Sequence, residues 1–503
     1  MMISTPCLFR ADASPRMGIG HVMRCLALAQ AVHAEKGRAV FLSHCESQSL
    51  HRRVETAGIR FLPLGERHPH PADLSTTLAL LRELQAAWLV LDGYNFDPGY
   101  QQAIRGAGHR LLVIDDMAHF PEYHADLLLN QNINAGQLRY ACGPDTTLLL
   151  GPRYALLRPE FLTWRGWRRE IPRMARNLLV TMGGGDPDNV TLRIVRVLHR
   201  VRGIELEAKV VVGPASPHTE ELRQAVDGTD GRLHLLANVT DMPALMAWAD
   251  VALAAGGSTC WELAFMGVPS MAIVLADNQR ALAEELGRRG VVVNLGWHEK
   301  VTPTQITQAV TRLMADGSSR IEMACRGREL VDGEGTDRVL MRLCGERFRL
   351  RRVCEADGRL LWEWANDPTV RRVSFSPEPI PWAQHVNWLK ARLEDPNCFF
   401  WIAVNEGEMP IGQARIELNE HEAVISIGLD AKCRGKGYGS TIIERAAKKL
   451  YQVSGAKLIH AYVKPDNEAS LRAFSKAGFQ RAGITQIRGQ SAVDFALRRE
   501  EMT

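Results

Sequence analysis

A histidine stands directly after two closely spaced glycines near the N-terminus, in the sequence Gly18-Ile-Gly20-His21. An apolar run precedes the glycines and apolar residues at helical spacing follow them, which predicts a loop between a strand and a helix. Such a loop lets the backbone approach an anion, to which the helix N-terminus presents free N–H groups. His21 would then lie beside a bound pyrophosphate, and the positive end of the helix favours the neutral imidazole that can take a proton from water. Alternatively, His21 only caps the helix or hydrogen-bonds a phosphate.

Two more glycine-rich segments follow apolar runs, at 183–185 and 256–259. We expect both at the carboxyl ends of parallel strands, where open α/β sheets bind ligands. Glu262, one turn into the next predicted helix, is placed to accept hydrogen bonds from ribose hydroxyls. Each segment alone is also consistent with a tight turn and a helix cap, but their repetition favours a nucleoside diphosphate. The candidate contacts for a nucleotide-sugar are Gly18, Gly20, Gly184, Gly256, Gly257, Ser258, Glu262, Asn278 and Gln279.

A further glycine-rich loop lies near the C-terminus, in Arg434-Gly-Lys-Gly437-Tyr-Gly439-Ser440. It stands between a strand-like run and a helical pattern, so its backbone N–H groups and the helix N-terminus can hold a diphosphate. A surface turn is the alternative. A second motif begins at Asn467 and runs through a short helical pattern to Gly478-Phe479.

The elements that must position these loops change in type along the chain. Up to about residue 340, short apolar runs alternate with helical patterns, which predicts parallel sheets buried on both faces. After about 345, alternating strand-like runs indicate an α+β domain. We therefore expect two Rossmann-like α/β domains, 1–160 and 175–345, and an α+β domain, 346–503.

Composition is that of a soluble globular protein. The chain has 503 residues, 46% of them hydrophobic, and a net charge of +4. This charge is too small to indicate a nucleic-acid-binding protein. Its ten cysteines form no C-x-x-C pair, so we expect no disulfide framework and no metal site. No apolar run is long enough to cross a membrane, and the N-terminus does not read as a signal peptide, so we expect a cytoplasmic protein without a membrane partner.

Residues 6 to about 340 resemble the UDP-sugar hydrolases of pseudaminic acid biosynthesis. The resemblance rests on the His21 loop, on Leu-Asp92-Gly-Tyr94 and Val113-Ile-Asp-Asp116, and on the segments 255–259 and 277–279. It implies two Rossmann-like domains in a glycosyltransferase-B-like arrangement, with a UDP-linked sugar in the cleft between them.

The same resemblance implies roles for individual residues. His21 corresponds to the general base that activates water for attack at the anomeric carbon, with UDP as the leaving group and no metal. Tyr94 and Asp12 match positions near the sugar. Gly257, Ser258 and Glu262 match the nucleotide site, and Asn278 and Gln279 match a loop at the diphosphate and sugar. Where the family commonly has Asp-His-Tyr, this chain has Asp92-Gly93-Tyr94, so the role of the middle position stays open.

The C-terminal motifs resemble those of GNAT acetyltransferases. The resemblance implies acetyl-CoA as co-substrate, with contacts from Leu429, Arg434, Gly435, Gly437, Gly439, Ser440 and Asn467. Many family members have a tyrosine where Phe474 stands, and phenylalanine cannot protonate the leaving thiolate. The opening of the domain resembles acetyltransferases for nucleotide-linked amino-sugars. It contains His385, for which an ordinary helix position is favoured over catalysis, so the base for acetylation stays unassigned.

Together the resemblances predict a bifunctional enzyme of unknown oligomeric state. It would acetylate UDP-4-amino-4,6-dideoxy-N-acetyl-β-L-altrosamine and hydrolyse the resulting UDP-2,4-diacetamido-2,4,6-trideoxy-β-L-altropyranose to free sugar and UDP. One alternative is a UDP-sugar glycosyltransferase fused to a GNAT acetyltransferase. Another is a nucleotide-sugar-sensing module fused to a protein acetyltransferase.

Overall fold

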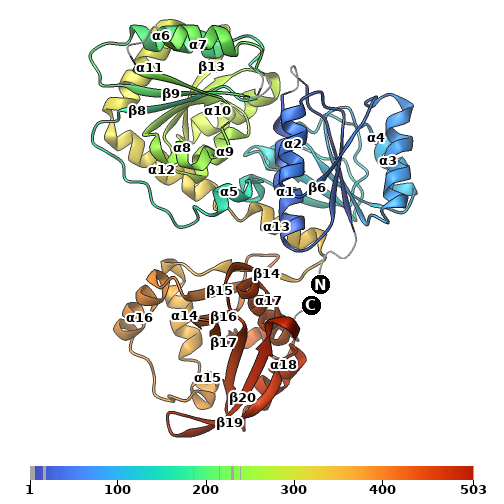
Figure 1. Ribbon diagram of the computed structural model, residues 1–503, viewed down its shortest axis with the longest axis vertical. Coiled ribbons are helices and arrows are strands. Elements are labelled where there is room, and N and C mark those ends of the chain that lie inside the picture. Colours follow the sequence, from blue (N-terminus) through green and yellow to red (C-terminus); the bar gives the residue numbers. More distant parts are fainter. Residues whose placement is uncertain are drawn as a thin grey trace. The chain divides into compact units, whose positions relative to one another are not determined.

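The computed structural model describes residues 6–14, 18–184, 186–213, 216–227, 231–237 and 239–501. The chain forms two compact units, Met1–Cys344 and Gly345–Thr503 (Figure 1). The first unit contains two parallel sheets and the second contains one mixed sheet. The expected fold class, two Rossmann-like α/β parts followed by an α+β part, is confirmed. The finer division of the first unit between 160 and 175 stays a prediction.

The first sheet has the strand order β3-β2-β1-β4-β5-β6-β7 and is parallel throughout. Its central strands are buried on both faces, as their apolar runs predict. The strands are β1 (Cys7–Ala11), β2 (Ala39–Ser43), β3 (Arg60–Pro63), β4 (Trp88–Asp92), β5 (Arg110–Ile114), β6 (Leu127–Asn130) and β7 (Thr147–Leu150). The helices are α1 (Gly20–Ala34), α2 (Gln48–Thr56), α3 (Pro71–Glu83), α4 (Pro98–Gly106) and α5 (Pro159–Leu162), with 3-10 turns η1 (Ala135–Gln137) and η2 (Pro152–Tyr154).

A buried arginine on β1 connects the sheet to α3. Arg10 is fully buried between the carboxylates of Asp12 and Asp73. Asp73 also accepts hydrogen bonds from the Tyr100 hydroxyl (2.8 Å) and from the backbone N–H of His68 (2.7 Å). Burial acts to raise the pKa of Asp73, but the bonds from Arg10 outweigh it and lower that pKa. Asp73 is therefore a charged carboxylate that is hydrogen-bonded to Arg10, Tyr100 and the backbone of His68.

Replacing Asp73 with asparagine is expected to destabilise the protein by about 3–5 kcal/mol, because one partner of a buried ion pair is removed. Because the folded-state pKa is lowered, this stabilisation is present above the unfolded pKa of about 4 and is lost as the pH falls through the folded value. Urea unfolding followed by circular dichroism measures the change. Asp277→Asn is the control, because the Asp277–Arg280 pair is exposed and worth at most about 1 kcal/mol. Equal effects of the two substitutions would contradict the prediction.

The second sheet, also parallel, has the order β10-β9-β8-β11-β12-β13. Its strands are β8 (Asn177–Thr181), β9 (Glu207–Val212), β10 (Leu233–Ala237), β11 (Val251–Ala255), β12 (Ser270–Val274) and β13 (Val292–Trp297). The helices are α6 (Val190–Arg200), α7 (Thr219–Asp227), α8 (Met242–Trp248), α9 (Thr259–Phe265), α10 (Arg280–Arg288), α11 (Pro303–Ala315) and α12 (Gly317–Leu330), with η3 (Asp277–Gln279). Residues of α6, α7 and α11 share one core, and residues of α8, α9 and α10 share another.

Helix α13 (Gly335–Leu343) follows the second sheet in sequence but packs with the first. Its side chains Val339, Leu340 and Leu343 belong to the core that α1 and α2 form on one face of the first sheet. The carbonyl of Leu343 also accepts a hydrogen bond from the indole N–H of Trp88 (3.0 Å) on β4. The first core is therefore completed by the last helix of its unit.

The third sheet has the order β14-β15-β16-β17-β18-β20-β19. Strands β17 and β18 pair only over Glu422–Val424, so the rest of β17 has no partner on that side. The strands are β14 (Phe348–Arg352), β15 (Cys398–Asn405), β16 (Pro410–Asn419), β17 (Glu422–Leu429), β18 (Leu458–Val463), β19 (Gln480–Ile487) and β20 (Gln490–Arg498). The helices are α14 (Gly358–Ala365), α15 (Pro368–Val373), α16 (Trp382–Glu394), α17 (Tyr438–Val453) and α18 (Glu468–Lys476), with η4 (Glu355–Asp357), η5 (Ala431–Cys433) and η6 (Arg499–Glu501).

Helices α17 and α18 cover one face of this sheet, and α14 and α16 cover the other. Within the part of the chain that the structure describes, no helix has both the length and the apolar character needed to cross a bilayer.

Candidate functional site

The first candidate site is built around His21, the second residue of α1. Its ring is almost fully buried, and Nδ1 lies 2.7 Å from Oδ1 of Asp92, the last residue of β4. Burial acts to raise the pKa of Asp92, but the charge of Arg24 and the hydrogen bonds from Arg24 and His21 outweigh it and lower that pKa. Because the carboxylate is ionised, the short distance requires the proton on Nδ1. His21 therefore donates to Asp92, and in the neutral ring it is Nε2 that carries the lone pair.

Arg24, one turn further along α1, fixes the carboxylates beside His21. Its Nε donates to Asp92 Oδ2 (2.6 Å) and its Nη1 donates to Asp116 Oδ1 (2.8 Å). Asn132 adds a bond from Nδ2 to Asp116 Oδ1 (2.9 Å). The acceptors that orient His21 are thus held by a buried network from α1, β4 and the loops after β5 and β6.

Tyr94 joins this network to the second sheet. Its hydroxyl donates to Asp116 Oδ2 (2.9 Å) and accepts from Asn278 Nδ2 (2.9 Å), which belongs to η3. Its ring meets the ring of His21 edge-on, with centroids 4.8 Å apart. Burial, and next the charge of Asp116, raise the pKa of Tyr94 far above its ordinary value, so the hydroxyl is a neutral donor. The structure brings together three residues expected at the sugar: His21, Tyr94 and Asn278.

Asp12 is engaged elsewhere. Its Oδ2 accepts from Arg10 Nη2 (2.9 Å), and its Oδ1 accepts from the backbone N–H of His44 (2.8 Å) and from Arg10. Both carboxylate oxygens therefore hold β1 to its neighbours. The carboxylate that contacts His21 is Asp92, not Asp12.

The glycine loops of the two sheets approach each other. A Cβ atom added to Gly184 would lie 2.6 Å from Cγ1 of Ile19, and one added to Gly20 would lie 4.0 Å from Oγ of Ser258. Gly18 has φ +78°, a conformation that suits glycine. Gly184 is required for close packing against the His21 loop. Gly185, the last residue of that glycine run, lies outside the described residues.

The remaining candidate contacts have partners that hold the loops in place. Ser258 is the N-cap residue of α9 but makes no side-chain capping bond. Glu262 Oε1 accepts from Nε and Nη2 of Arg158 (both 2.9 Å); burial nevertheless raises the pKa of this carboxyl. Gln279 Oε1 accepts the N–H of Leu275 (2.9 Å), and a Cβ at Gly256 or Gly257 would contact the Gln279 side chain.

The second candidate site is the loop before α17. Gly435 and Gly437 adopt φ +74° and +82°, and no atom lies within 4 Å of a Cβ built on either. Gly437 is the N-cap residue of α17 and provides no side-chain cap. An open loop with uncapped helical N–H groups fits a diphosphate such as that of coenzyme A.

The neighbours of this loop hold it against the sheet. Arg434 pairs with Asp367 (3.1 Å), and its Nε donates to the carbonyl of Leu429 (3.3 Å). Gly439 and Ser440 are buried in the first turn of α17. Asn467 caps α18 by accepting from the N–H of Ser470 (3.2 Å).

Comparison with known proteins gives family matches for two parts of the chain. Residues 347–480 match the family model of the acetyltransferase (GNAT) domain, and residues 182–332 match that of the glycosyltransferase family 28 C-terminal domain. An uncharacterized protein of Methanocaldococcus jannaschii is 21% identical over 93% of this chain and 96% of its own. The UDP-2,4-diacetamido-2,4,6-trideoxy-beta-L-altropyranose hydrolase of Campylobacter jejuni is 23% identical over 57% of this chain and 97% of its own.

Among solved structures, an aminoglycoside acetyltransferase in complex with coenzyme A is 22% identical, covers 31% of this chain and 96% of its own, and has a TM-score of 0.28. The resemblances drawn from the motifs are confirmed by the family models and by the Campylobacter relative. The chain is thus a fusion of a region homologous to that UDP-sugar hydrolase and to family 28 glycosyltransferases with a GNAT acetyltransferase domain.

Proposed function

We propose that the second unit acetylates the 4-amino group of UDP-4-amino-4,6-dideoxy-N-acetyl-β-L-altrosamine and that the first unit hydrolyses the product. The products of hydrolysis are UDP and 2,4-diacetamido-2,4,6-trideoxy-L-altrose. The observation that carries the proposal is the 2.7 Å bond between His21 Nδ1 and Asp92 at the glycine loop, because it leaves Nε2 as a proton acceptor. The substrates are proposed by analogy with the Campylobacter hydrolase.

In hydrolysis, His21 Nε2 takes a proton from a water molecule as that water attacks the anomeric carbon. The bond between this carbon and the UDP oxygen breaks, and backbone N–H groups of the glycine loops stabilise the charge on the departing diphosphate. Asp92 keeps the proton on Nδ1 and stabilises the imidazolium that forms. The Tyr94 hydroxyl and the Asn278 amide orient the sugar. In acetylation, bound acetyl-CoA supplies the activated acetyl group, and the loop from Gly435 to Gly439 holds its diphosphate.

The test is mass spectrometry of the purified full chain incubated with acetyl-CoA and the UDP-4-amino sugar in ¹⁸O-labelled water. We expect a gain of one acetyl group on the UDP-sugar, followed by free diacetamido sugar carrying one ¹⁸O and unlabelled UDP. Label in UDP instead of the sugar would contradict attack at the anomeric carbon. Failure to consume the UDP-sugar at all would refute the proposal.

The match of residues 182–332 to family 28 glycosyltransferases supports a second candidate, in which an acceptor hydroxyl replaces water. Formation of a glycoside when candidate acceptor alcohols are added, at the expense of free sugar, would decide for it.

Replacing Asp92 with asparagine is expected to lower hydrolysis by about 10²-fold. An amide N–H facing Nδ1 favours the tautomer with the proton on Nε2, which cannot accept one from water. The rate of UDP release under saturating substrate measures the effect. Asp97→Asn is the control, because the contacts of Asp97 are the cap of α4 and His68. A rate close to that of the unsubstituted protein would exclude the positioning role of Asp92.

A further inference from the structure

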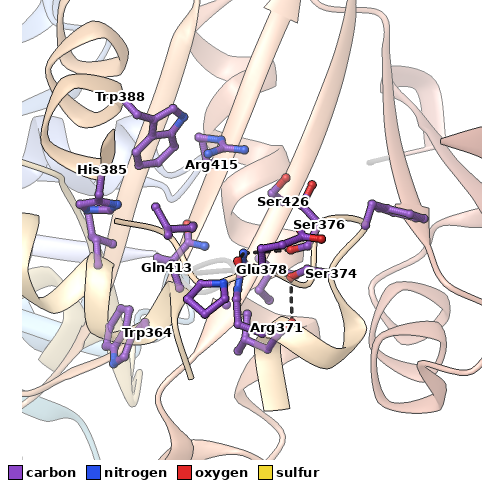
Figure 2. Close-up of a pocket in the computed structure, with 18 of the residues that line it drawn as sticks. Trp364, Arg371, Ser374, Ser376, Glu378, His385, Trp388, Gln413, Arg415 and Ser426 are labelled. Atoms are coloured by element: carbon purple, nitrogen blue, oxygen red, sulfur yellow. Dashed lines mark hydrogen bonds between the residues drawn. The ribbon is translucent and has the colours of Figure 1, made fainter. Parts of the chain in front are cut away.

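The second unit contains a cavity of about 630 Å³ on the side of the sheet covered by α14 and α16 (Figure 2). Its walls come from α14, α15, α16, β16, the end of β17 and the β19–β20 turn. Residues 426–429 form one wall, and the loop proposed to hold coenzyme A, which runs from Gly435 to Gly439, follows them after η5. If the proposed function holds, the acceptor amine and the thioester must meet beside this wall.

Few cavity-lining groups can exchange a proton at neutral pH. Among the lining residues that the structure describes, the ionisable side chains are Arg371, Glu378, His385, Arg415 and Arg488. The guanidinium groups stay protonated and cannot act as bases. The candidates that remain are the carboxylate of Glu378 and the imidazole of His385.

These two candidates differ in placement. Glu378 is exposed and lies on the loop between α15 and α16, where its backbone carbonyl accepts from Arg371. His385 on α16 is only 2% exposed. Its ring bonds the backbone of Gly358, while Nε2 is buried and has no hydrogen-bond partner among the described residues. A buried polar atom without a partner in the wall of a cavity indicates a ligand group that completes it.

A second unpartnered acceptor lies in the same cavity wall. Gln413 on β16 lines the cavity, and its Oε1 is buried without a hydrogen-bond partner in the described structure. Gln413 pairs across the sheet with Gly428 of β17, next to the start of the coenzyme loop. An amine that carries several N–H donors matches two such acceptors.

Two of the charged groups on the elements packed around His385 have ion-pair partners. Asp357 of η4 pairs with Arg351, and Arg359 of α14 pairs with Glu363. The remaining ionisable groups of α16 and of the elements packed against it are Glu355, Lys390, Arg392, Glu394 and Cys398. Aromatic rings flank the imidazole, with centroids 6.0 Å away at Trp382 and 5.3 Å away at Trp388. The site therefore favours a neutral ring.

We propose that His385 is the proton acceptor for acetyl transfer. The amine nitrogen forms a bond to the thioester carbon, the carbon–sulfur bond breaks, and the amine proton passes to His385 Nε2. Coenzyme A leaves as the thiolate and takes a proton from solvent, because Phe474 cannot supply one and lies buried against Phe479 and Phe495. Gln413 Oε1 accepts a second N–H of the amine and holds it beside the thioester.

The protonation state of His385 follows from its surroundings. Burial lowers the pKa of this imidazole below its ordinary value of 6.5, and the bond to Gly358 opposes the shift only in part. The ring is therefore neutral and able to accept a proton at pH 7. We expect kcat for acetylation to fall as the pH drops through a value below 6.5.

The test replaces His385 with asparagine in the full chain, with acetyl-CoA and the UDP-4-amino sugar as substrates. Asparagine can keep a donor for the backbone of Gly358 but removes Nε2. We expect kcat for acetylation to fall about 10²-fold, the KM for acetyl-CoA to stay within about twofold, and the acid limb of the kcat profile to disappear. Release of UDP from the diacetamido UDP-sugar should be unchanged, which shows that the first unit is intact.

Two further variants make the outcome decisive. Glu378→Gln should keep the acid limb, and His421→Asn, at an exposed histidine of the same unit, should keep both kcat and the acid limb. The proposal is overturned if His385→Asn keeps kcat or its acid limb, if only the KM for the amine rises, or if Glu378→Gln loses the acid limb instead. If His385→Asn fails to fold, the pH profiles of kcat for the unsubstituted protein and for Glu378→Gln test the proposal by themselves. Absence of acetylation by the unsubstituted protein would refute the proposed function, which is a separate result.

Discussion

Replacing His21 with alanine is expected to lower the release of UDP by about 10²–10⁴-fold, the usual contribution of a general base. Nδ1 of His21 is hydrogen-bonded to Asp92. In the neutral ring, Nε2 is therefore the atom that can accept a proton. Water alone must then attack the anomeric carbon. Chromatographic measurement of UDP from the diacetamido UDP-sugar gives the rate, and acetyl transfer by the same preparation should be unchanged.

The matched control is His234→Ala, because His234 lies in the first unit, is about half exposed and pairs with Glu207. It should release UDP at the unsubstituted rate. Near-normal hydrolysis by His21→Ala would remove His21 from the mechanism. A parallel loss of acetylation would instead indicate a general folding defect.

Replacing Gly437 with valine is expected to lower kcat/KM for acetyl-CoA by about 10³-fold while hydrolysis of the diacetamido UDP-sugar continues. At φ +82° a β-branched residue is strained by about 1–3 kcal/mol, and relief of the strain moves the N–H groups that face the diphosphate. Each hydrogen bond lost to a charged group costs about 1.5–3 kcal/mol. A thermal shift with acetyl-CoA and the rate of acetylation measure the loss.

Gly203→Val is the matched control. Gly203 has φ +81° and, like Gly437, no atom within 4 Å of a Cβ built on it, but it lies in the first unit. It carries the same backbone strain and should leave acetylation unchanged. Normal acetyl transfer by Gly437→Val would remove this loop from the coenzyme site.

Much of the fold follows from local patterns in the sequence. Apolar runs such as 88–92 and 251–255 are buried along their whole length and form central parallel strands, as predicted. The structure divides the chain into two units after Cys344. What local patterns did not reveal is that α13 packs with the first core, because only a long-range contact decides which sheet a helix covers.

The site shows the same division. Glycines with positive φ or with no room for a side chain were found from sequence, because their backbone requirement is local. The carboxylates around His21 were not assigned, although Asp92 and Asp116 stand in quoted motifs at strand ends. Arg24 pairs with both Asp92 and Asp116 and so joins them in one network. No spacing along the chain predicts these two ion pairs. His385 was judged an ordinary helix residue because burial and the unpartnered Nε2 are visible only in three dimensions.

Because α13 packs in the first core, the chain can be divided into its two units only after this helix. A gene truncated after residue 330 would keep both parallel sheets, yet its product would leave α1 and Trp88 without the apolar side chains that cover them. Such a fragment should aggregate or be degraded. A free-standing version of the first unit must therefore run to at least Cys344, and natural splitting of the gene would be tolerated only beyond that residue.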